Sequence, residues 1–423
     1  MAPPRRLLMV AYHFPPLAGS SGIQRTLRLV QQLPEFGWEP LVLSARPFAY
    51  ERTSDDLMSE IPPGTVVRRA LALDTARHLS VAGRYLSRLA LPDRWTSWRF
   101  DGVRAGMELI RRYRPQALWS TFPIATAHLI GSELQRRSGL PWIADFRDPI
   151  VQPEHPADPE MRRQHRKIEA QALRSARLAL FATAGAAADC SARNPQTEAR
   201  IDVLENGYDE AAFAAAERLA GTVSRDPQAP HVLLHSGIVY PDERDPSQLF
   251  AALRRLHAEG SIRPGRLLVR MRAAVHEDAI RSLAQQHGVA DYLDLAPALN
   301  YVEALAEMLN AGALLLLQAS NCNQQVPAKL YEYFRARRPI LALTDAQGDT
   351  ARVLRKAGVE RTASLASATE IAALIRAHLA TQGQGLLADP QQIERHSRRS
   401  RSRQLAAWLD SMISASPSAD RPS

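Results

Sequence analysis

A lysine and a glutamate in the stretch PAKLYEYF, residues 327–334, have types and spacing suited to nucleotide binding. Pro327 is typical of the first turn of a helix, so Lys329 and Glu332 would lie one turn apart near a helix N-terminus. Lys329 and the free N–H groups of that turn could bind a diphosphate, and the Glu332 carboxylate could accept both ribose hydroxyls. An exposed Lys–Glu pair, stabilising the helix by about 0.2–0.5 kcal/mol, would explain the same spacing.

The stretch HSGIVYPDERDP, residues 235–246, offers a second cation after a predicted strand. Arg244 could reach a phosphate from the carboxyl end of that strand, which is where parallel α/β sheets bind ligands. The alternative is a turn built on Pro241 and Asp242 that binds no ligand.

The loop YHFPPLAGSSG, residues 12–22, joins an apolar run to a helical pattern. Gly19 and Gly22 would let a phosphate approach the backbone at the helix N-terminus. The spacing matches neither the dinucleotide-binding glycine motif nor a P-loop. A plain loop with turn glycines is therefore an equal alternative.

Two further stretches, STFP at residues 120–123 and ADFRDP at residues 144–149, follow predicted strands of the first half. Both should therefore lie at the same edge of one sheet. Arg147, between two aspartates, could hold a substrate hydroxyl or phosphate, or form an internal ion pair. His128 is predicted to be a helix-face histidine rather than a catalyst.

Apolar runs alternate with helical patterns, which predicts two successive α/β units with parallel sheets. The polar stretch 220–230 separates them, and an amphipathic helix over residues 390–413 follows the second. The predicted strands are residues 7–11, 40–44, 66–69, 117–120, 142–145, 178–182 and 201–204, then 231–235, 266–270, 292–295, 313–318 and 340–343.

Length and composition predict a water-soluble, cytoplasmic protein of two or three domains. The chain has 423 residues, 45% of them hydrophobic and 23% charged, and its two cysteines are too few for a disulfide framework. We expect neither a secretory signal nor a membrane-spanning helix, because the apolar stretches are too short. The net charge of +9 favours a phosphate-bearing partner: a nucleotide, an anionic membrane or a nucleic acid.

Nucleic acid is the least favoured of these partners, because the arginines are not interleaved with aromatic residues. The run of Arg398, Arg399, Arg401 and Arg403 is predicted to be the solvated face of the C-terminal helix.

Taken in order, these motifs resemble those of the family 4-like glycosyltransferases over about residues 7–412. The resemblance implies the GT-B architecture, an α/β fold of two Rossmann-like domains with parallel sheets facing an interdomain cleft. The stretches that carry it are residues 12–25, 35–40, 141–149, 205–213, 236–246, 327–333 and 338–339.

The resemblance also implies the domain limits. It predicts an acceptor-side domain at residues 1–213, a linker at 214–230 and a nucleotide-sugar domain at 231–388. A closing helix at 389–413 and a flexible tail at 414–423 would complete the chain.

By the same resemblance, one set of residues would bind the donor and another would line the acceptor half of the cleft. Glu332 falls on the ribose, Lys329 and Arg244 fall near the diphosphate, and Gly237 falls on the glycine of the second domain. Gly19 and Gly22 fall beside the donor phosphates and the acceptor. Asp148, with Arg147 next to it, falls in the acceptor half.

Three positions depart from the family pattern. Gln324 stands where the family has the first of two paired glutamates, and Ile238 stands where it has an arginine. Thr121 replaces an acceptor-side histidine. These departures concern the contacts to the sugar.

The expected activity is transfer of a sugar from a nucleotide diphosphate sugar to a hydroxyl of a sugar or lipid-linked sugar, in polysaccharide or glycolipid biosynthesis. The chain has no D-x-D triplet, so we expect neither a metal nor another cofactor. The resemblance implies retention of the anomeric configuration. A nucleotide-sugar epimerase and a non-catalytic GT-B-like subunit are the alternatives.

Residues 79–100 suggest a peripheral contact with an anionic membrane. Leu79, Leu86 and Leu89 recur at helical spacing with Arg84 and Arg88 between them, and tryptophans follow. Such a helix suits a lipid headgroup layer, although a helix packed on the first domain would show the same pattern.

Overall fold

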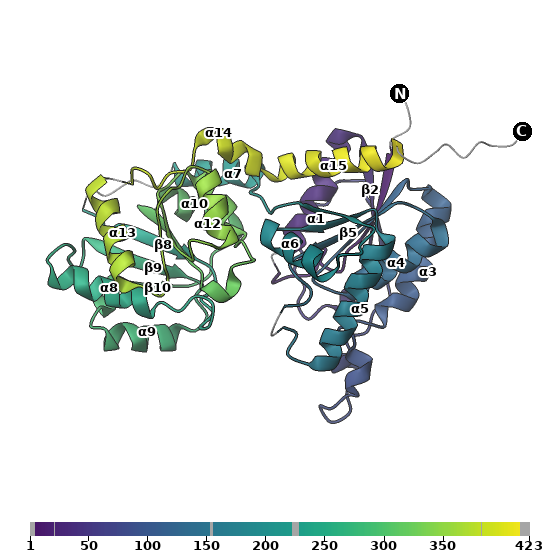
Figure 1. Cartoon of the computed structure of the whole chain (residues 1–423), viewed down its shortest axis with the longest axis horizontal. Coiled ribbons are helices and arrows are strands. Elements are labelled where there is room, and N and C mark those ends of the chain that lie inside the picture. Colours follow the sequence, from purple (N-terminus) through teal and green to yellow (C-terminus); the bar gives the residue numbers. More distant parts are fainter. Residues whose placement is uncertain (1–4, 21, 153–154, 222–227, 382, 415–423) are drawn as a thin grey trace, which may run out of the picture. The chain divides into compact units, whose positions relative to one another are not determined.

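The computed structural model describes residues 5–20, 22–152, 155–221, 228–381 and 383–414, and the chain forms two compact units (Figure 1). The first unit comprises residues 1–205 together with 398–423, and the second comprises residues 206–397. Each unit is an α/β domain built on one parallel sheet. The predicted α/β class with two parallel sheets is therefore confirmed.

The first unit contains a seven-stranded sheet in the order β3-β2-β1-β4-β5-β6-β7. Each of its strands overlaps one predicted from the apolar runs. The strands are β1 (Arg5–Val10), β2 (Trp38–Ala45), β3 (Val66–Ala70), β4 (Ala117–Thr121), β5 (Trp142–Arg147), β6 (Leu178–Phe181) and β7 (Arg200–Val203).

Helices cover both faces of this sheet, which explains why its central strands are apolar at successive positions. In β1, Leu8 and Val10 pack into one hydrophobic cluster, while Leu7 and Met9 pack into the other. The helices of this unit include α1 (Gly22–Gln32), α3 (Trp98–Tyr113), α4 (Thr126–Ser138), α5 (Pro159–Ser175), α6 (Ala184–Arg193) and α15 (Arg398–Ser414).

The second unit contains a six-stranded parallel sheet in the order β10-β9-β8-β11-β12-β13. Here too, neighbouring residues of a central strand face opposite clusters, as Leu233 and Leu234 do. The strands are β8 (His231–Ser236), β9 (Leu267–Arg272), β10 (Leu293–Ala296), β11 (Ala313–Leu317), β12 (Ile340–Leu343) and β13 (Thr362–Ala363).

Seven helices of eight or more residues lie in the described part of the second unit. They are α7 (Glu210–Ala220), α8 (Ser247–Ala258), α9 (Glu277–Gln286), α10 (Tyr301–Asn310), α11 (Lys329–Ala336), α12 (Asp349–Lys356) and α13 (Ala368–Thr381).

The boundaries between the parts of the chain differ from the predicted limits. The predicted linker at 214–230 is helical up to Ala220, because Phe213 and Ala216 of α7 are buried against α10. The first unit ends at Glu205, and residues 222–227 of the linker lie outside the described residues. Of the predicted tail, only Ser414 is described, and it ends α15.

The C-terminal helix α15 belongs to the first unit. Leu405 and Leu409 lie in the same cluster as Leu7 and Met9 of β1, and the indole N–H of Trp38 donates to Asp410 Oδ1 at 2.7 Å. The preceding residues form the short α14 (Pro390–Ile393) and a 3-10 turn, so the predicted helix at 389–413 is interrupted.

The arginines of α15 pair with carboxylates of the first unit. The Arg399 guanidinium lies 2.7 Å from Glu35 Oε2, and Arg401 forms an ion pair with Glu205. At least two of the four arginines at residues 398–403 therefore form ion pairs within this unit.

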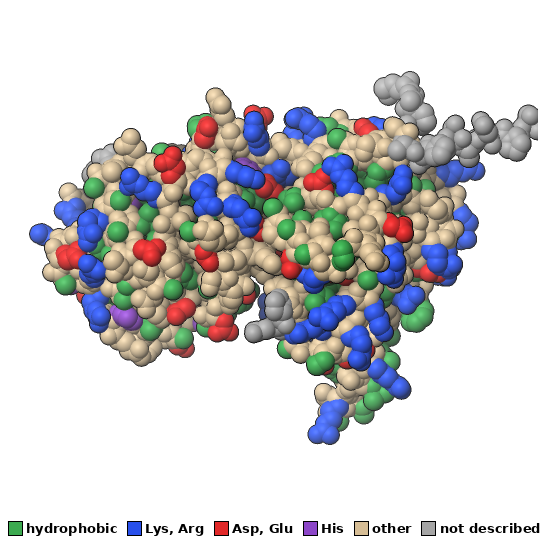
Figure 2. Space-filling model, in the orientation of Figure 1, with side chains coloured by type: hydrophobic (Ala, Val, Ile, Leu, Met, Phe, Trp, Pro, Cys, Tyr) green, Lys and Arg blue, Asp and Glu red, His purple; other side chains and the backbone are tan. Residues whose placement is uncertain are grey.

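Residues 79–97 are not the helix that the leucine spacing predicted, and that prediction is wrong. Between β3 and the start of α3 at Trp98, only Thr75–His78 (α2) and the 3-10 turn Ser87–Ala90 are helical. Val81 and Arg84 exchange two backbone hydrogen bonds, of 2.8 and 3.0 Å, across a turn in which Gly83 has φ +75°. This turn interrupts the helical pattern. The exposed loop that contains it projects from the unit (Figures 1 and 2).

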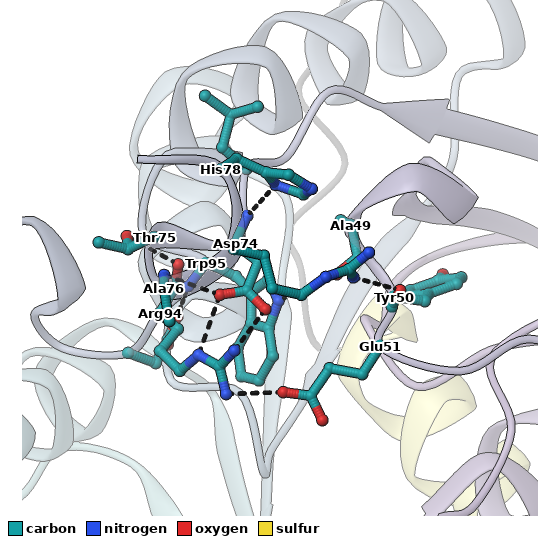
Figure 3. A network of polar contacts seen from close by, with 12 residues as sticks. Ala49, Tyr50, Glu51, Asp74, Thr75, Ala76, His78, Arg94 and Trp95 are labelled. Atoms are coloured by element: carbon teal, nitrogen blue, oxygen red, sulfur yellow. Dashed lines mark hydrogen bonds and ion pairs between the residues drawn. The ribbon is translucent and has the colours of Figure 1, made fainter. Parts of the chain in front are cut away.

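A buried aspartate anchors the base of this projecting loop, residues 79–90 (Figure 3). Asp74 is fully buried and caps α2 by accepting the Ala76 N–H at 3.0 Å. Its carboxylate also accepts two hydrogen bonds from Arg94, at 2.9 and 2.6 Å, and Arg94 binds Glu51 at 2.6 Å. One carboxylate therefore joins both ends of the segment that carries the loop.

We expect Asp74→Asn to lower the free energy of unfolding by about 1.5–3 kcal/mol, because an amide cannot replace a charged acceptor of three hydrogen bonds. The measurement is urea denaturation. The matched control is Glu51→Gln, which removes the exposed partner of the same arginine and should cost under about 1 kcal/mol. Equal, small effects of both variants would contradict the anchoring role.

Candidate functional site

Lys329 and His235 lie in contact at the carboxyl end of β8. Lys329 is the first residue of α11 and is half-buried, and its Nζ lies 3.2 Å from His235 Nε2. The His235 ring is fully buried, and its Nδ1 lies 3.0 Å from the Leu315 carbonyl oxygen on β11. Because a carbonyl only accepts, this contact assigns the ring hydrogen to Nδ1 and leaves Nε2 as an acceptor for Lys329.

The surroundings of Lys329 disfavour its charge. Burial lowers the pKa of the Lys329 amine to about 7, the charge of Arg244 also lowers it, and Glu332 acts in the opposite direction. Burial also lowers the pKa of the His235 imidazole well below its usual range, so the ring is neutral at physiological pH. Lys329 therefore lies close to its titration midpoint in the neutral range.

Gly237 makes room for the lysine. Its φ of +114° is typical of glycine, and a Cβ at this position would lie 3.0 Å from Lys329 Nζ. The Lys329 amine therefore lies close to the turn after β8. The predicted residues Gly237 and Lys329 are brought together by the fold.

The loop after Gly237 turns back and places Arg244 beside the same group. The Arg244 backbone N–H donates to the Tyr240 carbonyl at 2.8 Å, and its guanidinium lies 5.0 Å from the centre of the Tyr240 ring. Arg244 Nη1 donates to the Ile238 carbonyl oxygen at 2.5 Å. A cation therefore contacts the backbone at Ile238, the position where the sequence resemblance predicted an arginine.

Glu332 is half-buried on α11, and its Oε1 accepts a hydrogen bond of 2.8 Å from the Tyr301 hydroxyl. It is not a fully solvated surface residue. Tyr301, the first residue of α10, was not identified from the sequence, because it lies 31 residues from Glu332 and only the fold brings them together. Gln324 is exposed on the loop that precedes α11.

A cavity of about 750 Å³ lies at the carboxyl ends of β11, β12 and β13. Gln318, Thr344, Asp345, Ser364 and Glu370 are among its lining residues. Asp245, next to Arg244 in the chain, also borders it.

In the first unit, Arg147, the last residue of β5, connects the first residue of α1 with β4. Its Nε donates to Thr121 Oγ1 at 2.9 Å and its Nη2 donates to the Gly22 carbonyl at 3.1 Å. A Cβ on Gly22 would lie 2.7 Å from both Arg147 Nη1 and His13 Nδ1, so a larger residue would displace one of them. Gly22 and Arg147 are thus in contact, and Thr121 accepts a hydrogen bond from the arginine.

The sequence suggested an ion pair between Arg147 and a neighbouring aspartate, but Asp145 pairs with Arg25 instead. It binds Asp145 through two hydrogen bonds of 2.8 and 2.9 Å, and both side chains are buried. Burial lowers the pKa of Arg147 to about 10, and burial together with the Arg147 charge lowers the pKa of His13 to about 3. Two cations around one buried carboxylate favour an anionic ligand at this sheet edge.

The remaining predicted residues of this unit occupy different environments. Asp148 is exposed, directly after β5, and Gly19 is exposed with φ +80°. His128 is buried on α4, where its Nδ1 lies 2.8 Å from Ser120 Oγ and its ring packs 4.6 Å from that of Phe146. This agrees with its prediction as a helix-face histidine.

Among the described residues, no group of three or more histidine, cysteine, aspartate or glutamate side chains could hold a metal ion. Within the same part of the chain, no helix is both long and apolar enough to span a membrane.

Neither a protein-family model nor a curated protein matches the chain. Among solved structures, sucrose-phosphate synthase from Thermosynechococcus elongatus matches with a TM-score of 0.66 and 13% identity, covering 97% of this chain and all of that one. Anabaena HepE in complex with UDP matches with a TM-score of 0.66 and 14% identity, covering 96% of this chain and 100% of that one.

WaaG, a glycosyltransferase involved in lipopolysaccharide biosynthesis, matches with a TM-score of 0.59 and 13% identity, over 95% of this chain and 99% of that one. At such low identity the similarity concerns the fold. The two parallel-sheet domains and these full-length matches show that the chain has the GT-B fold.

Proposed function

We propose that the protein is a glycosyltransferase that moves a sugar from a nucleotide diphosphate sugar to an acceptor hydroxyl, with retention of configuration and without a metal. The observation that carries the proposal is the group formed by Gly237, Arg244, Lys329 and Glu332 at the carboxyl edge of the second sheet. The similarity to HepE, solved with UDP and with UDP-glucose, supports a nucleotide-sugar donor.

In this proposal, Glu332 accepts the ribose hydroxyls, while Lys329 and Arg244 bind the diphosphate. The bond between the anomeric carbon and the diphosphate oxygen breaks, and the acceptor oxygen forms the new bond to that carbon. The acceptor proton passes to a diphosphate oxygen. The two cations stabilise negative charge that develops on the leaving group, which is the main requirement of this chemistry.

The first unit would supply the acceptor side. Arg147, Asp148, the exposed Gly19 and the half-buried Gly22 lie at the sheet edge where ligands of parallel sheets bind. The cationic excess at Arg25 and Arg147 suits a phosphate of the donor or of a phosphate-bearing acceptor.

Two alternatives share this fold. A non-catalytic subunit would be expected to lose its phosphate contacts, whereas here Arg244 contacts the position of the missing arginine. A nucleotide-sugar epimerase would release a changed donor without an acceptor. Incubating the purified protein with nucleotide sugars, with and without acceptor sugars, separates all three by their products.

We further propose that the acceptor is a lipid-linked sugar at the cytoplasmic face of a membrane. The projecting loop carries Val81, 81% exposed, and Leu86, 59% exposed, and Arg84 and Arg88 of the same loop are also exposed. Apolar side chains beside arginines suit the headgroup layer of an anionic bilayer. With such an acceptor, the enzyme would act in polysaccharide or glycolipid biosynthesis.

The first test concerns Glu332. Glu332→Gln should weaken UDP binding by about 1.5–3 kcal/mol, and it should abolish the preference for UDP over 2′-deoxy-UDP, because the carboxylate accepts the ribose hydroxyls. Calorimetry with both nucleotides measures this preference. The control Tyr301→Phe removes the hydrogen bond to Glu332 but keeps its carboxylate. An unchanged preference in Glu332→Gln would exclude the ribose role.

The second test concerns the diphosphate. Arg244→Ala and Lys329→Ala should each lower kcat by about 10²–10³, because each removes a group that stabilises the developing charge. Arg254→Ala, an exposed arginine of α8, is the control and should leave kcat unchanged. Transfer should persist in EDTA. Transfer that persists when Arg244 and Lys329 are both replaced by alanine, or transfer that EDTA abolishes, would contradict the proposed mechanism.

The third test concerns the membrane. The protein should sediment with phosphatidylglycerol vesicles at low salt and be released as ionic strength rises, because exposed charges are screened within about 8 Å at physiological salt. Replacing Arg84 and Arg88 by glutamate should abolish binding. Replacing Arg254 and Arg281 of the second unit changes the charge equally and should not. If the wild-type protein does not bind these vesicles even at low salt, the membrane proposal is wrong and the acceptor is a soluble molecule.

A further inference from the structure

We propose that His235 is a positioning residue that fixes the Lys329 amine against the turn after β8 and favours its protonated form for a bound diphosphate. The inference rests on the proposed function, because it assigns the ligand of Lys329 to a nucleoside diphosphate. It adds a buried histidine whose part in ligand binding is to orient the cation that binds the phosphate.

The position of the histidine ring is fixed by its surroundings. His235 is fully buried near the end of β8, and the Leu315 carbonyl on the neighbouring β11 holds its Nδ1 at 3.0 Å. The ring therefore presents Nε2 to the lysine, and the 3.2 Å separation from Nζ is a hydrogen-bond distance. Both ring nitrogens of a buried neutral histidine are used.

The position of the amine is equally constrained from the other side. The Gly237 backbone lies so close that an added Cβ would be 3.0 Å from Lys329 Nζ, and the Gly237 N–H is itself bound to the Arg272 carbonyl at 2.9 Å. Lys329 is also the first residue of α11. Its amine is thus held between the ring and a rigid turn rather than extended into solvent.

The groups around Lys329 act in opposite directions on its charge, so the hydrogen bond to His235 Nε2 matters for its protonation. Arg244 opposes the ammonium form and Glu332 supports it, while the Tyr333 hydroxyl, whose pKa burial raises, stays neutral. A neutral Nε2 acceptor stabilises the ammonium without adding charge. Since the pKa of Lys329 is about 7, UDP affinity should fall as the pH rises above neutrality and the amine loses its proton.

The other tautomer makes a different prediction. The Ile238 carbonyl, which accepts from Arg244 Nη1, also lies near the His235 ring. If the ring hydrogen were on Nε2 instead, that nitrogen could donate to a carbonyl but could not accept a hydrogen bond from Lys329. Nitrogen NMR of labelled His235 distinguishes the two tautomers, and a hydrogen on Nε2 would overturn the inference.

Two substitutions of His235 test its hydrogen bonds to Leu315 and to Lys329 separately. His235→Asn keeps a donor at the Nδ1 position for Leu315 but cannot reach the lysine, whereas His235→Gln places an acceptor near the Nε2 position. We expect roughly tenfold weaker UDP binding in His235→Asn and near wild-type binding in His235→Gln. The pH midpoint of binding should move to lower pH in His235→Asn alone.

The titration of Lys329 can also be measured in the free protein. The chain has only three lysines, Lys167, Lys329 and Lys356, so a spectrum of labelled lysine is simple to assign. A lower Lys329 midpoint in His235→Asn, restored in His235→Gln, would support the inference. An unchanged midpoint and affinity in His235→Asn would overturn it, as would equal losses in both variants with equal losses of stability.

The two proposals fail in distinguishable ways. A wild-type protein that binds none of UDP, GDP and ADP at any pH would contradict the proposed nucleotide function, and the inferred diphosphate ligand with it. The contact between His235 and Lys329 would still be decided by the lysine titration. A wild-type protein that binds UDP while His235→Asn behaves identically would contradict the inference alone.

Discussion

Coverage of both faces of each parallel sheet is the constraint on which the rest of the structure depends. Central strands such as β1 and β8 bury neighbouring residues in opposite clusters, so a polar side chain within them needs a buried partner. The carboxyl ends of the strands escape this requirement, since the chain there passes into loops. Gly22 and Arg147 gather at this edge of the first sheet, and Gly237 and Lys329 gather at this edge of the second.

The same constraint explains how much of the fold the sequence predicts. Strands buried on both faces must be continuous apolar runs, and all twelve predicted strands overlap observed ones. β13 was missed because two residues, Thr362 and Ala363, make no such run. The helix predicted at residues 79–97 is absent for the opposite reason, because a regular leucine pattern is present there without a helix. The leucines lie on an exposed loop whose base is held by the ion pair of Asp74 and Arg94.

Part of the candidate site was predicted and part was not, for a physical reason. Lys329 and Glu332 are close in sequence and lie on one helix, so their spacing alone relates them. His235 and Tyr301 contact these residues only through the register of strands and the packing of helices. Arg25 likewise reaches Asp145 across 120 residues, and no local pattern distinguished it from Arg147 as the partner of that carboxylate.

The membership of α15 in the first unit has a consequence for how the chain matures during synthesis. The second unit, residues 206–397, is continuous and can fold as soon as it leaves the ribosome. The first unit cannot complete its core until residues 398–414 arrive, because Leu405 and Leu409 belong to the same hydrophobic cluster as Leu7 and Met9. The part of this apolar face that α15 covers thus stays exposed to solvent through most of translation, the interval in which a nascent chain most needs a chaperone.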